Sequence, residues 1–136
     1  MLEQCYNLDM KTILVDAVNT FVVDGKIFQP LHDLLEQYPN GKIILTNAND
    51  EQIIQFGLKD LPYDLFTLKH NPDKIDPEYF NQMLDHFKLQ PQDVVYFEHN
   101  PEALKSAQSV GITAYLYDSE MKDLETLRNF LNDNLS

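Results

Sequence analysis

Short apolar runs alternate with amphipathic stretches along most of the chain. Five such runs, each bounded by turn or polar residues, are predicted to be strands: 12–16, 42–45, 64–68, 94–97 and 113–117. Runs that stay apolar instead of alternating with polar residues are typical of strands buried on both faces. The pattern therefore indicates a parallel sheet with both of its faces covered.

The stretches between and after these runs carry apolar side chains at helical spacing. Five helices are expected, and for four of them the inward face can be named: Leu31, Leu34, Leu35 and Tyr38 after Pro30; Ile53 and Ile54 after a cap at Asn49 or Asp50; Phe80, Met83, Leu84 and Phe87 after Pro77; and Met121, Leu124, Leu127, Phe130 and Leu131. The remaining helix is opened by Pro101 and closed by Gly111. Strands that alternate with helices predict βαβ units. We expect one α/β domain over residues 1–136, with its core at about 11–134 and helices on both faces of a five-stranded parallel sheet.

One insertion interrupts the alternation after the first strand. Two apolar triplets there flank Asp24-Gly25, which is a strong local signal for a two-residue β-hairpin turn. We expect a small hairpin at about 21–28, lying over the end of the first strand. The other connections are too short for a second domain, so no cap domain is expected.

Three of the predicted strands end in polar side chains, which are Asp16, Thr46 and the pair Glu98-His99. The carboxyl ends of parallel strands share one edge of the sheet, and open α/β sheets bind their ligands at that edge. A single aspartate at a strand end more often caps a turn. Several polar residues at the same edge instead favour a ligand or catalytic site.

The chain is acidic, with 10 Lys and Arg against 22 Asp and Glu, and its net charge of −12 disfavours binding to nucleic acid. The single Cys5 has no partner for an internal disulfide and indicates a reducing compartment. The sequence has no signal-like leader and no apolar run long enough to cross a membrane. We therefore expect a cytoplasmic protein that binds neither nucleic acid nor membranes.

Four segments, each in order on a predicted element, form a recognisable series. They are Asp16-Ala-Val-Asn-Thr20, Ile43-Ile-Leu-Thr46-Asn47, Lys74-Ile-Asp-Pro-Glu-Tyr-Phe80, and Val94-Val-Tyr-Phe-Glu-His-Asn100 with a later Val110-Gly111 turn. This series resembles the four motifs of the haloacid dehalogenase-like (HAD) superfamily of aspartyl-nucleophile hydrolases. The resemblance spans Thr12 to Tyr117. It implies the three-layer, Rossmann-like HAD fold without a cap, with strands in the spatial order 5-4-1-2-3.

The resemblance also implies a role for each site residue. Asp16 would be the nucleophile that attacks phosphorus or carbon and forms a covalent ester. Thr46, Asn47 and Lys74 would bind the phosphate, and Thr46 and Lys74 would offset the charge that grows on the transferred group. The catalytic set implied is thus Asp16, Thr46 and Lys74, with Lys69 as the second choice for the lysine.

The family normally holds Mg²⁺ between its carboxylates. In this sequence the implied metal ligands are Asp16, the carbonyl of Val18, Glu98 and His99. His99 aligns with the principal metal-binding Asp, and Ala103 stands where a further Asp or Asn is usual. Imidazole suits Zn²⁺ or another transition metal better than Mg²⁺. We therefore expect weak Mg²⁺ binding, or a preference for a softer divalent metal.

A further departure concerns proton transfer. Val18 occupies the position at which phosphatase members have a second Asp, the general acid/base, and Asn19 replaces the motif's glycine. The sequence thus leaves three functions open. The first is a capless phosphohydrolase that uses Asp16, and the second is a catalytically impaired HAD-fold binding or regulatory protein. The third is a dehalogenase-like hydrolase, which is disfavoured because no arginine lies near the site.

Capless relatives act on macromolecules or cover the site with a neighbouring subunit. If the site is active, its expected partners are a phosphorylated small molecule or a phosphoprotein, and a homo-oligomer would supply the missing cover.

Overall fold

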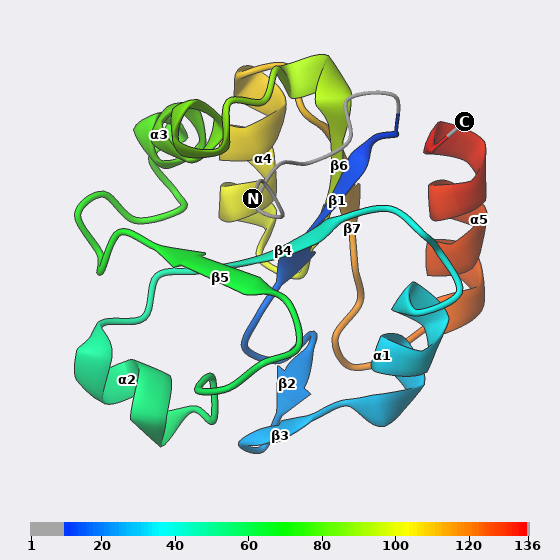
Figure 1. The fold of residues 1–136 in the computed structure, drawn as a ribbon, viewed down its shortest axis with the longest axis horizontal. Coiled ribbons are helices and arrows are strands. Elements are labelled where there is room, and N and C mark those ends of the chain that lie inside the picture. The colour runs from blue at the N-terminus through cyan, green and yellow to red at the C-terminus, as the bar shows by residue number, and fades with distance from the viewer. Residues whose placement is uncertain (1–9, 136) are drawn as a thin grey trace.

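A five-stranded parallel sheet forms the centre of the molecule, with helices on both of its faces (Figure 1). The structure, a computed structural model, describes residues 10–135; Cys5 lies outside this range. The strands are β1 (Thr12–Asp16), β4 (Lys42–Thr46), β5 (Asp64–Thr67), β6 (Val94–Glu98) and β7 (Thr113–Leu116). The helices are α1 (Gln29–Leu35), α2 (Asp50–Gln55), α3 (Pro77–Phe87), α4 (Pro101–Ser109) and α5 (Leu124–Asn134), with a short 3₁₀ turn η2 (Pro91–Asp93) before β6. The predicted three-layer α/β fold is confirmed.

The order of the strands across the sheet is β5-β4-β1-β6-β7, so β1 is the central strand. This is the predicted order 5-4-1-2-3 read from the opposite edge. All four pairings are parallel, with Asp16 opposite Leu45 of β4 and Val15 opposite Phe97 of β6. Since Glu98 directly follows Phe97, the polar ends of β1, β4 and β6 lie together at one edge of the sheet.

Alternate residues of the central strand enter two different apolar cores. Ile13 and Val15 pack with residues of α1 and α5, whereas Leu14 packs with residues of α3 and α4. All three side chains are fully buried, which explains why the strand sequence does not alternate. Asp16 follows Val15 and therefore points to the same face as Leu14, toward α3 and α4.

Tyr38 packs against the core as expected but lies beyond α1, because i→i−3 hydrogen bonds to Leu34 and Leu35 tighten the chain directly after the helix. Two other apolar residues, Ile54 and Met121, are exposed although the helical pattern placed them inward. Ile54 is 72% exposed, because α2 is a short helix on which Ile53 takes the inward position. Met121 precedes α5 and is 75% exposed.

The predicted hairpin is present, with β2 (Val22–Val23) and β3 (Lys26–Ile27) paired antiparallel. Asp24 and Gly25 both have positive φ, at 53° and 78°, as a tight two-residue hairpin turn of type I′ requires. The turn packs against Gly57, where an added Cβ would lie 2.3 Å from the Gly25 carbonyl oxygen. Within residues 10–135 the segment between β1 and α1 thus holds a hairpin and no cap domain.

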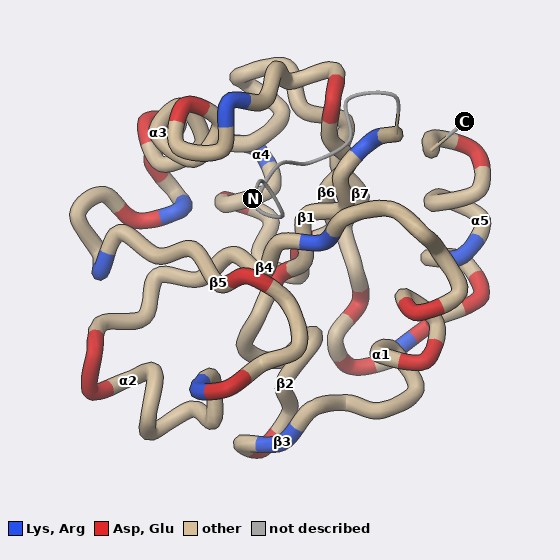
Figure 2. Tube along the Cα trace, viewed as in Figure 1, with Lys and Arg blue, Asp and Glu red and all other residues tan. Residues whose placement is uncertain are grey.

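Charged positions lie mainly around the outside of the fold, and acidic ones outnumber basic ones (Figure 2). Among residues 10–135, no helix combines the length and apolar character that crossing a membrane requires.

Candidate active site

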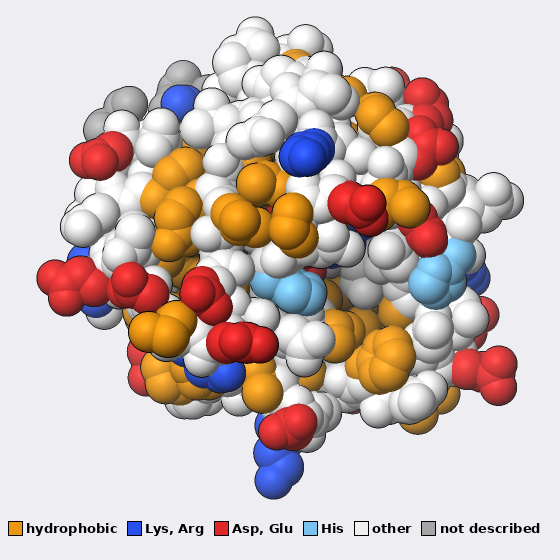
Figure 3. Space-filling model, turned by 180° about the vertical axis from the view of Figure 1, so that it is seen from behind, with side chains coloured by type: hydrophobic (Ala, Val, Ile, Leu, Met, Phe, Trp, Pro, Cys, Tyr) orange, Lys and Arg blue, Asp and Glu red, His pale blue; other side chains and the backbone are white. Residues whose placement is uncertain are grey.

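A cleft of about 170 Å³ lies at the carboxyl edge of the sheet. Its walls include Asp16, Thr46, Lys74, Glu98 and His99, so the predicted residues do come together. Seen from behind, pale-blue histidine side chains stand on either side of a hollow in the surface (Figure 3). The described residues 21–28 do not line this cleft, so the hairpin lies beside it against Gly57 and not over it as expected.

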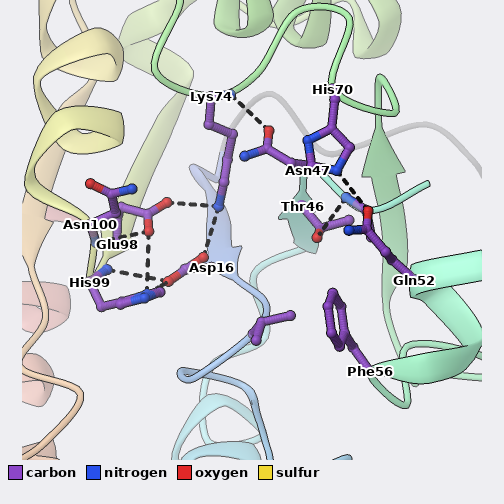
Figure 4. A pocket seen from close by; sticks show the side chains of 12 residues that line it. Asp16, Thr46, Asn47, Gln52, Phe56, His70, Lys74, Glu98, His99 and Asn100 are labelled. Atoms are coloured by element: carbon purple, nitrogen blue, oxygen red, sulfur yellow. Dashed lines mark hydrogen bonds and ion pairs between the residues drawn. The ribbon is translucent and has the colours of Figure 1, made fainter.

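Lys74 links the two buried carboxylates of the site (Figure 4). Its Nζ donates to Asp16 Oδ1 and to Glu98 Oε1, each at 2.8 Å, and the residue is 6% exposed. Lys74 lies in the loop before α3. Asn47, directly after β4, holds this loop in place, because its Oδ1 accepts from the Lys74 backbone N–H at 2.8 Å. Asn47 thus positions the lysine, in addition to lining the cleft.

The second oxygen of Asp16 is held by the turn after β1 and by His99. Oδ2 accepts from the Thr20 hydroxyl at 2.8 Å and from the His99 backbone N–H at 3.2 Å, and the ring atom His99 Nδ1 also contacts it. Asn19, which stands where the motif has glycine, adopts a left-handed φ of 67°. That conformation places the fully buried Thr20 beside the Asp16 carboxylate. In the sequence Thr20 was only the last residue of the first motif, with no role predicted for it.

Glu98 is enclosed on both of its oxygens. The Tyr96 hydroxyl donates to Oε1, and the Asn100 backbone N–H donates to Oε2 at 3.0 Å. Tyr96 was expected to be a simple core aromatic, but its hydroxyl is part of the site. The available signal was its position two residues before Glu98 on one strand, which places both side chains on the same face.

The charges of the site are strongly coupled. Burial alone would raise the pKa of Asp16, but the Lys74 ammonium and the contact with His99 outweigh it and hold that pKa well below its usual range. Burial would lower the pKa of Lys74, but Asp16 and Glu98 outweigh it and raise it. Burial and the neighbouring Asp16 charge raise the pKa of Glu98 to about 7. The contact with Asp16 raises the pKa of His99 in spite of burial. Asp16 is therefore ionised and Lys74 is charged at neutral pH.

Asp16, Glu98 and His99 could each offer one ligand atom to a metal ion, and these atoms lie within 4.8 Å of one another. The arrangement fits Mg²⁺ poorly. His99 Nδ1 contacts Asp16 Oδ2 and lies 3.4 Å from Glu98 Oε2, and Mg²⁺ would need such oxygens as ligands. Imidazole is also a poor ligand for a hard cation. Weak Mg²⁺ binding and a preference for a softer metal stay predictions.

The opposite wall of the cleft combines Thr46, a predicted site residue, with His70 and Gln52, to which the sequence gave no role. Thr46 accepts from the Ala48 backbone N–H at 3.2 Å through its Oγ1. His70 also lines the cleft, with Nδ1 at 2.8 Å from Asp73 Oδ1 and Nε2 at 2.7 Å from Gln52 Oε1. No sequence signal joins His70 to Gln52, because Gln52 lies on α2 and His70 lies in the loop after β5, and the two meet only in the fold.

Lys69, the second choice for the lysine, is directed elsewhere. Its Nζ pairs with Asp50 at 3.1 Å, and 55% of its side chain is exposed. Lys74 is thus the lysine that the fold delivers to Asp16.

No protein-family model and no curated protein matches the sequence. Solved structures do match the fold. A mutant HAD family enzyme from Bacteroides thetaiotaomicron, in complex with magnesium and inorganic phosphate, is 13% identical with a TM-score of 0.64, over 87% of this chain and 98% of that one. A HAD-superfamily hydrolase of subfamily IA from Geobacter sulfurreducens is 10% identical with a TM-score of 0.63, over 79% and 89%.

An uncharacterised protein from Corynebacterium glutamicum is 17% identical with a TM-score of 0.62, over 93% of this chain and 97% of that one. Likenesses at these identities show the fold. The chain therefore has a HAD-like core fold, as the motif resemblance implied.

Proposed function

We propose that the chain is a hydrolase of phosphate monoesters and that the Asp16 carboxylate is its nucleophile. The observation that carries the proposal is the unequal engagement of the two Asp16 oxygens. Oδ2 is contacted by Thr20 and by both the backbone and the ring of His99, whereas the described partner of Oδ1 is Lys74 Nζ. A carboxylate oxygen has two lone pairs, so Oδ1 keeps one for attack.

The reaction follows from these positions. Oδ1 forms a bond to phosphorus while the bond to the leaving oxygen breaks, which gives an aspartyl phosphate. The Lys74 ammonium, 2.8 Å from Oδ1, and the Thr46 hydroxyl bind the phosphoryl oxygens and offset their charge. Water then attacks phosphorus, releases inorganic phosphate and restores the carboxylate.

The leaving group is the weak point of this reaction. Val18 lines the cleft at the position where a phosphatase of this type would have its proton donor, and a valine side chain cannot supply a proton. Loss of a general acid/base typically costs on the order of 10²–10⁴ in rate. The favoured substrates are therefore phosphates whose leaving groups depart as stable anions, such as aryl or acyl phosphates, on a small molecule or on a phosphoprotein.

The same valine favours a second candidate function, a phosphate-binding or regulatory protein that turns over slowly or not at all. Dehalogenase-like chemistry finds less support. Arg128 Nη1 donates to Gln37 Oε1 at 2.7 Å and does not line the cleft, so it cannot receive a halide there.

The test compares the wild type with Asp16→Asn on para-nitrophenyl phosphate and on an alkyl phosphate. Because the neighbour from Bacteroides thetaiotaomicron is a complex with magnesium and phosphate, each protein is assayed on each substrate with Mg²⁺, Mn²⁺, Co²⁺ and Zn²⁺ in turn and with a chelator. Asp24→Asn removes an equal charge from the nearby hairpin turn and is the matched control. We expect slow hydrolysis of the aryl ester that Asp16→Asn abolishes and Asp24→Asn leaves intact. Hydrolysis that survives in Asp16→Asn would refute Asp16 as nucleophile.

A further inference from the structure

We propose that the His99 ring occupies the place of a divalent cation between Asp16 and Glu98, so that the site assembles without a metal ion. This inference rests on the proposed function, since it concerns the same cleft. It goes beyond that function by naming the group that takes the place of the metal, and it stands against the sequence-based expectation of a softer metal at this site.

The position of the His99 ring supports the inference. Nδ1 of His99 contacts Asp16 Oδ2 and lies 3.4 Å from Glu98 Oε2 (Figure 4). It also lies 3.4 Å from Thr20 Oγ1. A nitrogen that faces two carboxylate oxygens must carry a hydrogen, because its lone pair would otherwise point at theirs. The ring therefore presents a donor at the point where a shared metal ion would have to bind.

The buried carboxyl groups of Asp16 and Glu98 are both paired by basic side chains of the protein. Asp16 and Glu98 are 2% and 1% exposed, and an unpaired buried carboxylate is costly. Lys74 donates to one oxygen of each carboxylate, Oδ1 of Asp16 and Oε1 of Glu98. His99 Nδ1 faces the remaining oxygen of each, Oδ2 and Oε2. Lys74 and the His99 ring, two basic groups of the chain itself, thus cover all four oxygens of the two carboxyl groups.

Two positions on this wall that could contribute an oxygen ligand do not offer a free one. Glu98 Oε2 is already capped by the Asn100 backbone N–H at 3.0 Å. One turn into α4, the buried Ala103 offers no oxygen from its side chain. Mg²⁺ requires near-octahedral oxygen coordination at about 2.0–2.1 Å, and here it would have to displace the His99 ring to obtain its first two ligands.

The test is metal binding measured without reference to activity. The wild type, His99→Asp and His99→Asn are titrated with Mg²⁺ and with Zn²⁺ by calorimetry, and their melting temperatures are followed with and without each metal. We expect no saturable binding and no rise in Tm for the wild type at millimolar Mg²⁺. His99→Asp should gain saturable Mg²⁺ binding and a Tm that rises with Mg²⁺, because it adds a carboxylate beside the two already present.

Two controls separate the causes. His99→Asn removes the ring without adding a charged oxygen and should not gain this binding. His86→Asp makes the same substitution at an exposed position outside the cleft, on α3, and should not gain it either. If His99→Asp does not fold, the wild-type titrations still decide the question.

Two results would overturn the inference. One is saturable Mg²⁺ or Zn²⁺ binding to the wild type that is lost in Asp16→Asn. The other is a folded His99→Asp that binds no Mg²⁺. Neither readout depends on turnover, so a wild type that hydrolyses no phosphate ester would refute the proposed function and leave the metal result to be judged separately.

Discussion

Replacing Lys74 by Met removes the charge that two buried carboxylates share and keeps a side chain of similar length. Lys74 Nζ lies 2.8 Å from both Asp16 Oδ1 and Glu98 Oε1, and the Lys74 side chain is 8% exposed. Removing one partner of a buried ion pair typically costs about 3–5 kcal/mol, because the remaining charge is left uncompensated. We expect Lys74→Met to lower the free energy of unfolding in urea by about that amount at neutral pH.

Lys69→Met is the matched control, since it removes a lysine from the same loop. Its partner Asp50 is 81% exposed in its side chain, and exposed pairs contribute about 0–1 kcal/mol. The two variants should therefore differ by at least about 2 kcal/mol.

The pH and a second mutation test the cause of the loss. The pKa of Glu98 is raised to about 7, so acidification protonates Glu98 and leaves Asp16 as the single uncompensated carboxylate. Lys74 lowers the pKa of Glu98, so Lys74→Met raises that pKa further and the cost of this substitution should grow as pH rises above 7. Lys74→Met/Glu98→Gln should recover this additional cost above pH 7. Equal losses for Lys74→Met and Lys69→Met would refute the reasoning.

Three other substitutions follow from the structure. The pKa of His99 is raised, so His99 stabilises the fold fully below its ordinary pKa of about 6.5 and loses this effect as pH rises through the folded-state value. Urea unfolding of the wild type should show this decline, and His99→Asn should show a smaller one, because Glu98, whose pKa is also raised, keeps its own share of the decline. Gly57→Ala should lower the free energy of unfolding in urea by more than about 1 kcal/mol, since φ at Gly57 is +74° and the new Cβ would lie 2.3 Å from the Gly25 carbonyl oxygen. Gly111→Ala, whose new Cβ would have its nearest contact at 3.4 Å, should lower it less. Val18→Asp should raise hydrolysis of alkyl phosphates by on the order of 10²-fold and of aryl phosphates less; equal effects on both esters would contradict a missing proton donor.

The sheet was predictable because its strands are buried on both faces. Ile13, Leu14 and Val15 are all fully buried, so their apolar run marked a strand directly. Helix starts were also predictable where a capping residue and proline coincide. The Asp76 side chain accepts from the Glu78 backbone N–H with Pro77 in the first turn, and Asn100 does the same before Pro101.

Helix ends and lone apolar residues were less predictable. Ile54 and Met121 are apolar like core residues, but Ile54 lies on the exposed side of the short helix α2 and Met121 lies in the turn before α5. Periodicity reports which residues share a face, and it does not report whether another element covers that face.

The convergence of Asp16, Thr46, Lys74, Glu98 and His99 was predictable from strand ends and from the motif resemblance. Contacts that the loop between β5 and α3 makes with other parts of the chain were not predictable. His70 meets Gln52 at 2.7 Å across 18 positions of sequence, and Asn47 holds the backbone of Lys74 across 27 positions. The contact of the His99 ring with Asp16 also required the structure, because the sequence placed both at one edge without fixing their orientation.

The most direct test of the account is to look for the covalent intermediate on Asp16. The wild type is mixed with para-nitrophenyl phosphate, quenched in acid and digested, and its peptides are examined by mass spectrometry. The account predicts one added phosphoryl group on the peptide that contains Asp16, visible because Val18 leaves both its formation and its hydrolysis without a proton-transfer group, and absent from Asp16→Asn. Substrate turnover with the phosphoryl group on another residue, or turnover that persists in Asp16→Asn, would contradict it.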